Sequence, residues 1–520
     1  MKNLPVTDLV IIAVYLAAMI LVGIYFSGKN KTSGQFTKAS GKISGWAIGL
    51  SLYATFLSTN TFLGVPGKAF GTNWNAFVFS LSMPFAAWIA SKYFVPFYRN
   101  AGGISAYTHL EKRFGPWART YAVLFFILTQ IARMGTIFFG IALTIQALTG
   151  YSMQTIMLVM GVCIIVYTVL GGMEAVIWTE VIQAGIKTLG ALLILHLIIK
   201  DIPGGVTKII EIGHQANKFS LGSFSPGFTT STFWVVLLYG FLINLNNFGL
   251  DQNYVQRYHA AASEKKAARS VWLCVWLYVP VSLLFFFIGT SLYSYTQIHP
   301  EFTQALKDQA GASMGMTGYA DKILPFFMAT RIPPGLTGLI ISALLSAAMS
   351  TISSGMNASA TVFTADIFRR YIKPDISDRV NLRVLQVTTV IFGLLGMGTA
   401  VAMIGVSSLL DVWWKLSGIF AGGVLGLFLL GIVSRTTRNR EAVIATIIGA
   451  LVITWMTLSY LLPQKYAFIK SPFHESMIIV IGTMTILLTG LLLSSARKNS
   501  DREEEGKVQP VNNLYNGNQS

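Results

Sequence analysis

Long runs of hydrophobic residues alternate with short polar segments along the whole chain. Each run is long enough to cross a bilayer as a helix, which takes roughly 17–25 residues. The pattern predicts thirteen spans in a single transmembrane domain, residues 1–496. They lie at 7–27, 45–66, 74–97, 119–148, 154–172, 176–199, 232–256, 268–295, 333–366, 384–406, 408–434, 441–462 and 474–496. Residues 497–520 are polar and predict a disordered cytoplasmic tail. We therefore expect an all-α polytopic protein, multi-pass in a bacterial-type inner membrane.

The charges favour one orientation of these spans. Only 11% of the residues are charged, yet the net charge is +17, which could indicate a nucleic-acid partner. Most lysines and arginines fall in alternate loops, within 29–42, 99–119, 257–269, 369–383 and 435–440, and in the tail. Positive-inside bias then places the N-terminus outside and the C-terminus in the cytoplasm, which requires an odd number of spans. A nucleic-acid partner is no longer needed to account for the charge.

Two predicted spans contain polar runs that a lipid-facing helix would not gather. Residues 55–67 include Thr55, Ser58, Thr59, Asn60 and Thr61, followed by Gly and Pro; five spans later, 244–252 include Asn244, Asn246, Asn247 and Asp251. Such runs indicate discontinuous helices whose freed carbonyls line a cavity. Because five is odd, two five-helix repeats would enter the membrane in opposite directions and build a site at its midplane. Helix–helix packing is the alternative role for such residues.

A third feature is a face of hydroxyl groups in span 333–366. Ala347, Ser350, Thr351 and Ser354 recur at helical spacing, and Ser353 flanks them. Hydroxyl and carbonyl oxygens are ligands that a sodium ion would accept in place of water. Together with the carbonyls of a broken helix, this face predicts a cation site.

Four cationic residues lie in or at the ends of spans: Lys92, Arg133, Lys187 and Lys415. Lys92 and Lys187 are expected to snorkel or to face a cavity. Arg133 lies near the middle of its span and needs an anion, a carbonyl cluster or a wet cavity. A guanidinium there suits bidentate binding of a carboxylate. A salt bridge or carbonyl clamp between helices is the alternative role.

The motifs ATFLSTNTFLGVPGKAF, GGMEAVIWTEVIQ, NNFGLDQNYVQR and SAAMSTISSGMNASATVFTADI resemble those of the sodium:solute symporter family. The resemblance implies a LeuT-type 5+5 inverted repeat, with repeat one at 45–199 and repeat two at 232–434. One extra helix precedes the repeats at 7–27, and two follow at 441–496. It also implies sodium-coupled symport of a small polar solute by alternating access, in a protein that works as a monomer and has no organic cofactor.

The resemblance implies ligands for one or two sodium ions. The first ion would be held by the carbonyls of Ala54, Leu57 and Ala347 and by the hydroxyls of Ser350 and Thr351. The second, found in some members, would use an Asp with serines of the hydroxyl face; the matching positions are Glu180, Ser350, Ser353 and Ser354. Because Glu180 replaces that Asp, the second ion depends on whether the longer side chain keeps the geometry.

The sequence TQIARMG around Arg133 is similar to that of bacterial sialic-acid symporters of this family, where the arginine binds the carboxylate. The resemblance therefore implies a carboxylated sugar such as sialic acid (N-acetylneuraminate). Ser58 and Thr61 match, whereas Phe56 and Ser80 depart from polar residues of those symporters. Asn60 is a further candidate in the same broken span, and Asn244 and Asn247 match positions that contact or gate the sugar in hexose-carrying relatives.

Other functions are less compatible with the sequence. An enzyme is not expected, because the six histidines show neither HExxH nor paired spacing. A channel is a further alternative; it would conduct ions without coupling their flow to a solute. Within transporters, a carrier of a neutral sugar, inositol or an amino acid is the alternative that stays open.

Overall fold

The computed structural model describes residues 4–310, 320–404, 409–460 and 462–507. Within these ranges the regular structure is helical, apart from one isolated bridge between Ile43 and Ala261. The first part of the chain comprises α1 (Val6–Ser27), α2 (Ser33–Lys38), α3 (Gly45–Phe56), η1 (Asn60–Gly64), α4 (Val65–Gly71), η2 (Trp74–Phe77), α5 (Val78–Leu81), α6 (Met83–Ile89), η3 (Ala90–Phe94), α7 (Val95–Ala101), α8 (Thr108–Phe114), α9 (Pro116–Thr149), α10 (Met153–Lys200) and α11 (Gly205–Gln215).

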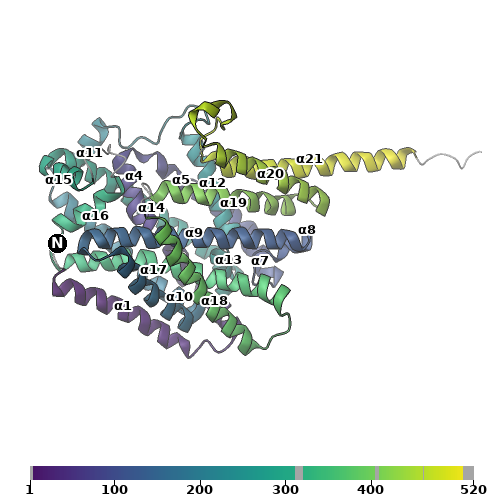
Figure 1. Cartoon of the computed structure of the whole chain (residues 1–520), viewed down its shortest axis with the longest axis horizontal. Helices are drawn as coiled ribbons and strands as arrows, with labels where there is room; N and C mark the ends of the chain where they lie inside the picture. The colour runs from purple at the N-terminus through teal and green to yellow at the C-terminus, as the bar shows by residue number, and fades with distance from the viewer. Residues whose placement is uncertain (1–3, 311–319, 405–408, 461, 508–520) are drawn as a thin grey trace, which may run out of the picture.

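The second part comprises α12 (Phe233–Leu250), α13 (Gln252–Ala260), α14 (Glu264–Ile298), α15 (Pro300–Ala310), α16 (Ala320–Arg331), α17 (Leu336–Val362), η5 (Phe363–Ile372), α18 (Asp378–Ala402), α19 (Leu409–Val433), α20 (Asn439–Ser459), η6 (Gln464–Ile469) and α21 (Met477–Lys507). The long helices lie roughly alongside one another in one bundle (Figure 1).

Among the described residues, 11 helices are long and apolar enough to cross a membrane, or 12 if the bent pair α3 and η1–α4 counts as one span. This count treats α10 as a single helix of 48 residues. A straight helix of that length would measure about 72 Å, more than twice the thickness of the hydrocarbon core. Gly172 interrupts it with φ 55° and ψ −156°, between the predicted spans 154–172 and 176–199. The total of thirteen spans stays a prediction.

Both predicted helix breaks are confirmed. In the first, α3 ends at Phe56 and the chain resumes its helical path at Asn60, with a bend of 57°. In the second, α12 ends at Leu250 and α13 begins at Gln252, because Asp251 between them is extended (φ −70°, ψ 117°). The Asp251 carboxylate accepts the backbone N–H of Asn253 and so caps the new helix.

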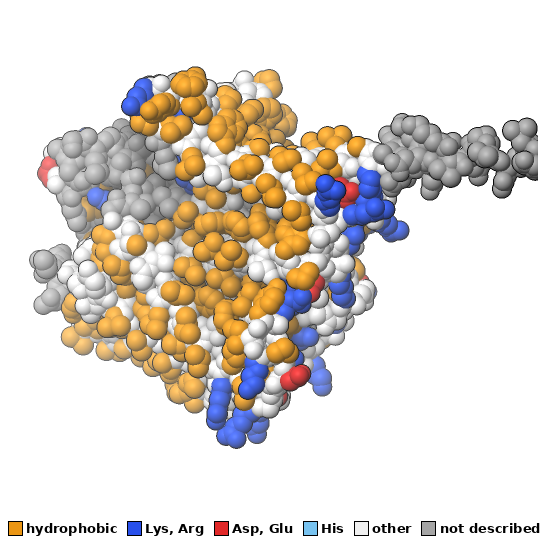
Figure 2. Space-filling view, turned by 45° about the vertical axis from the view of Figure 1, so that its right-hand side comes forward, with side chains coloured by type: hydrophobic (Ala, Val, Ile, Leu, Met, Phe, Trp, Pro, Cys, Tyr) orange, Lys and Arg blue, Asp and Glu red, His pale blue; other side chains and the backbone are white. Residues whose placement is uncertain are grey.

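The basic loops lie together at one end of the bundle. Arg99 donates to the carbonyl of Ala261 at 3.0 Å, and Arg119 donates to Asp366 at 2.8 Å. Arg113 donates to the carbonyl of Gly431, and Arg497 pairs with Glu441. Figure 2 shows lysines and arginines gathered at this end, beside a wall covered largely by hydrophobic side chains. The N-terminus lies at the opposite end of the bundle from the projecting tip of α21 (Figure 1).

The predicted boundary of the disordered tail is wrong. Helix α21 continues through residues 497–507, so the last span has a helical extension in place of the expected disordered segment. The segment 495–507 is rich in Arg, Lys and Glu, which are good helix formers and can prolong a helix into water. The rest of the predicted tail, 508–520, lies outside the described residues.

Close packing between α14 and α4 depends on Gly289. A Cβ at this position would lie 2.3 Å from the carbonyl oxygen of Pro66 and 2.7 Å from Cβ of Ala69. We expect Gly289→Ala to lower the stability of the folded protein by about 1–3 kcal/mol, because two helices must separate to admit the methyl group. Thermal unfolding in detergent measures the change.

Gly398→Ala in α18 is the matched control, because a Cβ there meets nothing within 4 Å. A helical Gly→Ala change in open space is worth roughly 0.5–1 kcal/mol of added stability. Equal unfolding midpoints for the two variants would contradict the packing argument.

Candidate functional site

A pocket opens beside the first helix break. Helices α3, α5, α9, α12, α14 and α19, together with η1, contribute its walls, and it holds about 710 Å³ of space, part of it open to solvent. Seven of the eight residues predicted to contact the solute line it: Phe56, Ser58, Asn60, Thr61, Ser80, Arg133 and Asn247.

Arg133 reaches the pocket from the middle of α9. Its side chain is nearly buried, and one terminal nitrogen donates to the carbonyl of Thr55 at 3.2 Å. The other lies 3.7 Å from the carboxylate of Asp251, which is longer than an N–H···O hydrogen bond. The guanidinium also lies 5.5 Å from the ring centre of Trp413. The carbonyl, the anion and the cavity expected around a buried arginine are therefore all present.

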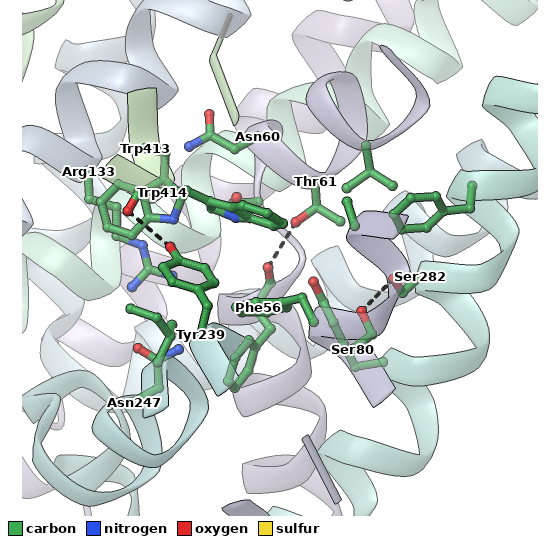
Figure 3. A pocket seen from close by; sticks show the side chains of 17 residues that line it. Phe56, Asn60, Thr61, Ser80, Arg133, Tyr239, Asn247, Ser282, Trp413 and Trp414 are labelled. Carbon is green, nitrogen blue, oxygen red and sulfur yellow. Dashed lines mark hydrogen bonds between the residues drawn. The ribbon is translucent and has the colours of Figure 1, made fainter. Parts of the chain in front are cut away.

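The remaining polar groups are spread around the pocket. Ser80 lies opposite Arg133 and shares a 2.7 Å hydrogen bond with Ser282 (Figure 3). Thr61 donates to the freed carbonyl of Phe56 at 3.3 Å, and Asn60 donates to Thr136 at 3.2 Å. The buried amide oxygen of Asn60 has no hydrogen-bond partner among the described residues. A solute with several hydroxyl groups could exchange hydrogen bonds with these side chains.

Asn244 is not in this pocket. Its amide donates to the carbonyl of Phe79 at 3.3 Å and to Ser82 at 3.1 Å, so it joins α12 to α5 and the start of α6. Asn247 lies three residues further along α12 and does line the pocket. The helix thus turns Asn244 toward a packing contact, and its predicted role in contacting or gating the solute stays a prediction.

Sequence reasoning missed the aromatic part of the pocket. Tyr239, Trp413 and Trp414 lie near Arg133, and the hydroxyl of Tyr239 donates to the carbonyl of Trp414 at 3.0 Å (Figure 3). Tyr278 and Phe286 of α14 also line it. The adjacent tryptophans 413 and 414 were the available signal in the sequence. However, one aromatic pair at the start of a span does not distinguish a pocket-lining helix from an ordinary membrane helix.

The ligands predicted for the first sodium ion converge on a side chain of the protein. The Nζ atom of Lys187 donates to the carbonyl of Ala54 at 2.6 Å, to the carbonyl of Leu57 at 2.9 Å and to the hydroxyl of Ser350 at 2.9 Å. Ser350 and Thr351 also donate to the carbonyl of Ala347, at 3.3 and 3.4 Å. Three of the five predicted oxygens thus surround the Nζ atom of Lys187.

A sodium ion does not fit among these oxygens while Lys187 is there. The three oxygens already accept hydrogen bonds from Nζ, so an ion could use them only by displacing the lysine side chain. The sequence predicts that this lysine snorkels or faces a cavity, but its ammonium group is fully buried against the helix break.

Two of the residues predicted to bind a second sodium ion, Glu180 and Ser354, also accept hydrogen bonds from a basic side chain of the protein. Arg257 donates to both carboxylate oxygens of Glu180, at 2.8 and 2.7 Å, and to the hydroxyl of Ser354 at 2.6 Å. Thr55 donates to Glu180 at 3.2 Å, and Ser51 and Ser354 donate to it as well. Ser353 instead donates to the carbonyl of Ser350 at 3.3 Å. The structure therefore brings Glu180 and Ser354 together, as the sequence predicts, but Ser353 bonds elsewhere and Arg257 engages the carboxylate.

The helical membrane domain, its two breaks and the pocket beside them define a membrane carrier with discontinuous helices. A model of the sodium:solute symporter family matches residues 36–449. The chain belongs to the sodium:solute symporter family. It is a multi-pass plasma-membrane transporter and not an enzyme, as the sequence predicted.

Individual relatives agree with this family. The chain is 31% identical over 498 residues to the "Sodium/sialic acid symporter NanT" of Aliivibrio fischeri, covering 94% of this chain and 93% of that protein. It is 32% identical over 483 residues to the "Sodium/sialic acid symporter SiaT" of Proteus mirabilis, covering 92% of each. The likeness to sialic-acid symporters that the sequence motifs indicated is confirmed.

Two solved structures support the fold. A substrate-bound, outward-open Na⁺-coupled sialic acid symporter superposes with a TM-score of 0.84 at 30% identity, covering 94% of this chain and 98% of that one. Mhp1, a nucleobase-cation-symport-1 family transporter, superposes with a TM-score of 0.55 at 13% identity, covering 89% and 95%. The second likeness concerns the fold alone. The LeuT-type fold predicted from the motifs is confirmed at this level.

Proposed function

We propose that this protein is a secondary active carrier that imports a carboxylated sugar, such as sialic acid, by alternating access. The observation that carries the proposal is the charge of the pocket. Of its 17 described lining residues, Arg133 alone is charged. A carboxylate bound there would meet a planar donor fork with which it can form charge-assisted hydrogen bonds. The aromatic rings and hydroxyl groups around it suit the body of a sugar.

The relatives support both the solute and the use of an ion gradient. Two of them are named sodium/sialic acid symporters, which supports symport coupled to a cation gradient. Several of the residues predicted as sodium ligands are instead bonded to Lys187 and Arg257. The Arg133–Asp251 pair supports the alternative of a neutral solute, in which Arg133 joins helices only.

The proposed topology has thirteen spans, with the N-terminus outside and the C-terminus in the cytoplasm. Residues 45–199 and 232–434 form the two inverted repeats, 7–27 precede them, and 441–496 follow as two further helices. Support comes from the break at Gly172, which divides α10, and from the gathering of the basic loops at one end. The transport unit is a monomer, because solute pocket and helix breaks belong to one chain.

Counterflow in proteoliposomes tests the solute without assuming a driving ion. Vesicles preloaded with unlabelled N-acetylneuraminate should accumulate the labelled compound transiently, and external glucose, inositol or proline should not compete. Vesicles without the protein are the control. Competition by a neutral sugar, with none by N-acetylneuraminate, would favour the neutral-solute alternative.

A further inference from the structure

Lys187 lies at the point where α10, α3 and α17 meet. Its side chain is fully buried, and its three N–H groups have three oxygen acceptors: two carbonyls at the end of α3 and the hydroxyl of Ser350 on α17. An ammonium group has three donors, so all of them are satisfied. The lysine thereby joins the broken helix to the hydroxyl-rich helix, which is the connection that a bound sodium ion would make.

Arg257 makes the equivalent connection two helical turns away along α10. Glu180 and Lys187 are seven residues apart and share one face of that helix. The guanidinium of Arg257, which comes from α13, links Glu180 to Ser51 on α3 and to Ser354 on α17. At each of the two predicted sodium positions, a basic side chain of the protein itself therefore bonds to some of the predicted ligands.

We propose that Lys187 and Arg257 are tethered replacements for the two sodium ions, so that this carrier binds its solute without sodium. A tethered basic side chain stays beside these oxygens at high effective concentration, whatever the salt outside. The breaks in α3 and α12 are then held in place by the protein itself. The proposal rests on the proposed function only for the choice of solute.

Removal of the Lys187 amine should make solute binding depend on sodium. We expect no such dependence in the wild-type protein. Lys187→Ala leaves the oxygens of Ala54, Leu57 and Ser350 without their cation, and gives a sodium ion room to reach them. Binding of N-acetylneuraminate to the purified full-length protein is measured by calorimetry in sodium chloride and in choline chloride of equal strength. The matched control is Lys200→Ala, at the exposed end of the same helix.

We expect the wild-type and Lys200→Ala proteins to bind with dissociation constants that agree within about twofold in the two salts. For Lys187→Ala we expect weaker binding in choline chloride and at least about tenfold recovery in sodium chloride, saturating with sodium. A saturable sodium requirement in the wild-type protein would overturn the proposal, and that measurement stands even if the variant folds poorly.

A second readout separates this proposal from the choice of solute. Thermal unfolding without any solute should show no sodium-specific stabilisation of the wild-type protein, and a sodium-dependent rise in the midpoint for Lys187→Ala. If N-acetylneuraminate fails to bind in either salt, the proposed solute is wrong, while the unfolding data still decide on the tethered cations. A sodium-specific rise in the wild-type midpoint would contradict them.

Discussion

Arg133→Ala should abolish uptake of an acidic sugar. Hydrogen bonds to charged groups contribute about 1.5–3 kcal/mol, so loss of the guanidinium should weaken binding roughly 10- to 150-fold. Arg133→Lys keeps the charge but loses the planar fork, and should recover only part of that affinity. Binding of N-acetylneuraminate to the purified variants, followed by counterflow, measures both effects.

Asp251→Asn is the control that separates a solute contact from a structural ion pair. If Arg133 serves only to pair with Asp251, 3.7 Å away, then neutralising either partner should impair transport equally. If Arg133 binds the solute, Asp251→Asn should retain binding, because the arginine remains and loses only a competing anion. Full retention of uptake in Arg133→Ala would assign the arginine a structural role.

Glu180→Ala should destabilise the protein more strongly than Gly289→Ala. Arg257 is 1% exposed in its side chain and Glu180 0%, so the variant leaves a buried guanidinium without its anion. Breaking a buried pair by removing one partner costs about 3–5 kcal/mol. Thermal unfolding in detergent should show a marked fall in the midpoint, together with reduced yield.

The matched control is Glu174→Ala, on the same helix and only half-buried. The double variant Glu180→Leu, Arg257→Met should recover much of the lost stability, because well-packed apolar residues often replace a buried ion pair without loss. If Glu180→Ala unfolds at the same temperature as Glu174→Ala, the pair does not stabilise the bundle.

The membrane fold was predictable because hydropathy and charge placement are signals spread over whole segments, so they do not depend on single residues. The helix breaks at 57–59 and at Asp251 were also predictable, since a run of polar residues inside an apolar span is costly unless it lines a cavity or packs between helices. The extension of α21 to Lys507 was missed because polar composition alone does not distinguish a disordered tail from a water-exposed helix.

The solute pocket could be predicted better than the cation sites. Arg133 was identifiable because a lone arginine in mid-span demands partners. The role of Lys187 was not, because a lysine in a span can also snorkel to the interface. Only the three-dimensional meeting of α10 with α3 and α17 brings its ammonium group to the oxygens. Arg257 lies just beyond a predicted span, so its position in the sequence indicates a cytoplasmic loop charge.

The contacts of Arg133 make solute recognition an exchange of one anion for another. The guanidinium already touches the carbonyl of Thr55 at the first break and lies near the carboxylate of Asp251 at the second. A solute carboxylate must therefore compete with the carboxylate of Asp251 for the N–H groups of Arg133. On the proposed function, a neutral sugar has no anionic group for that competition, so Asp251 would favour acidic solutes. If a solute displaced Asp251 from Arg133, the contacts at both helix breaks would change together.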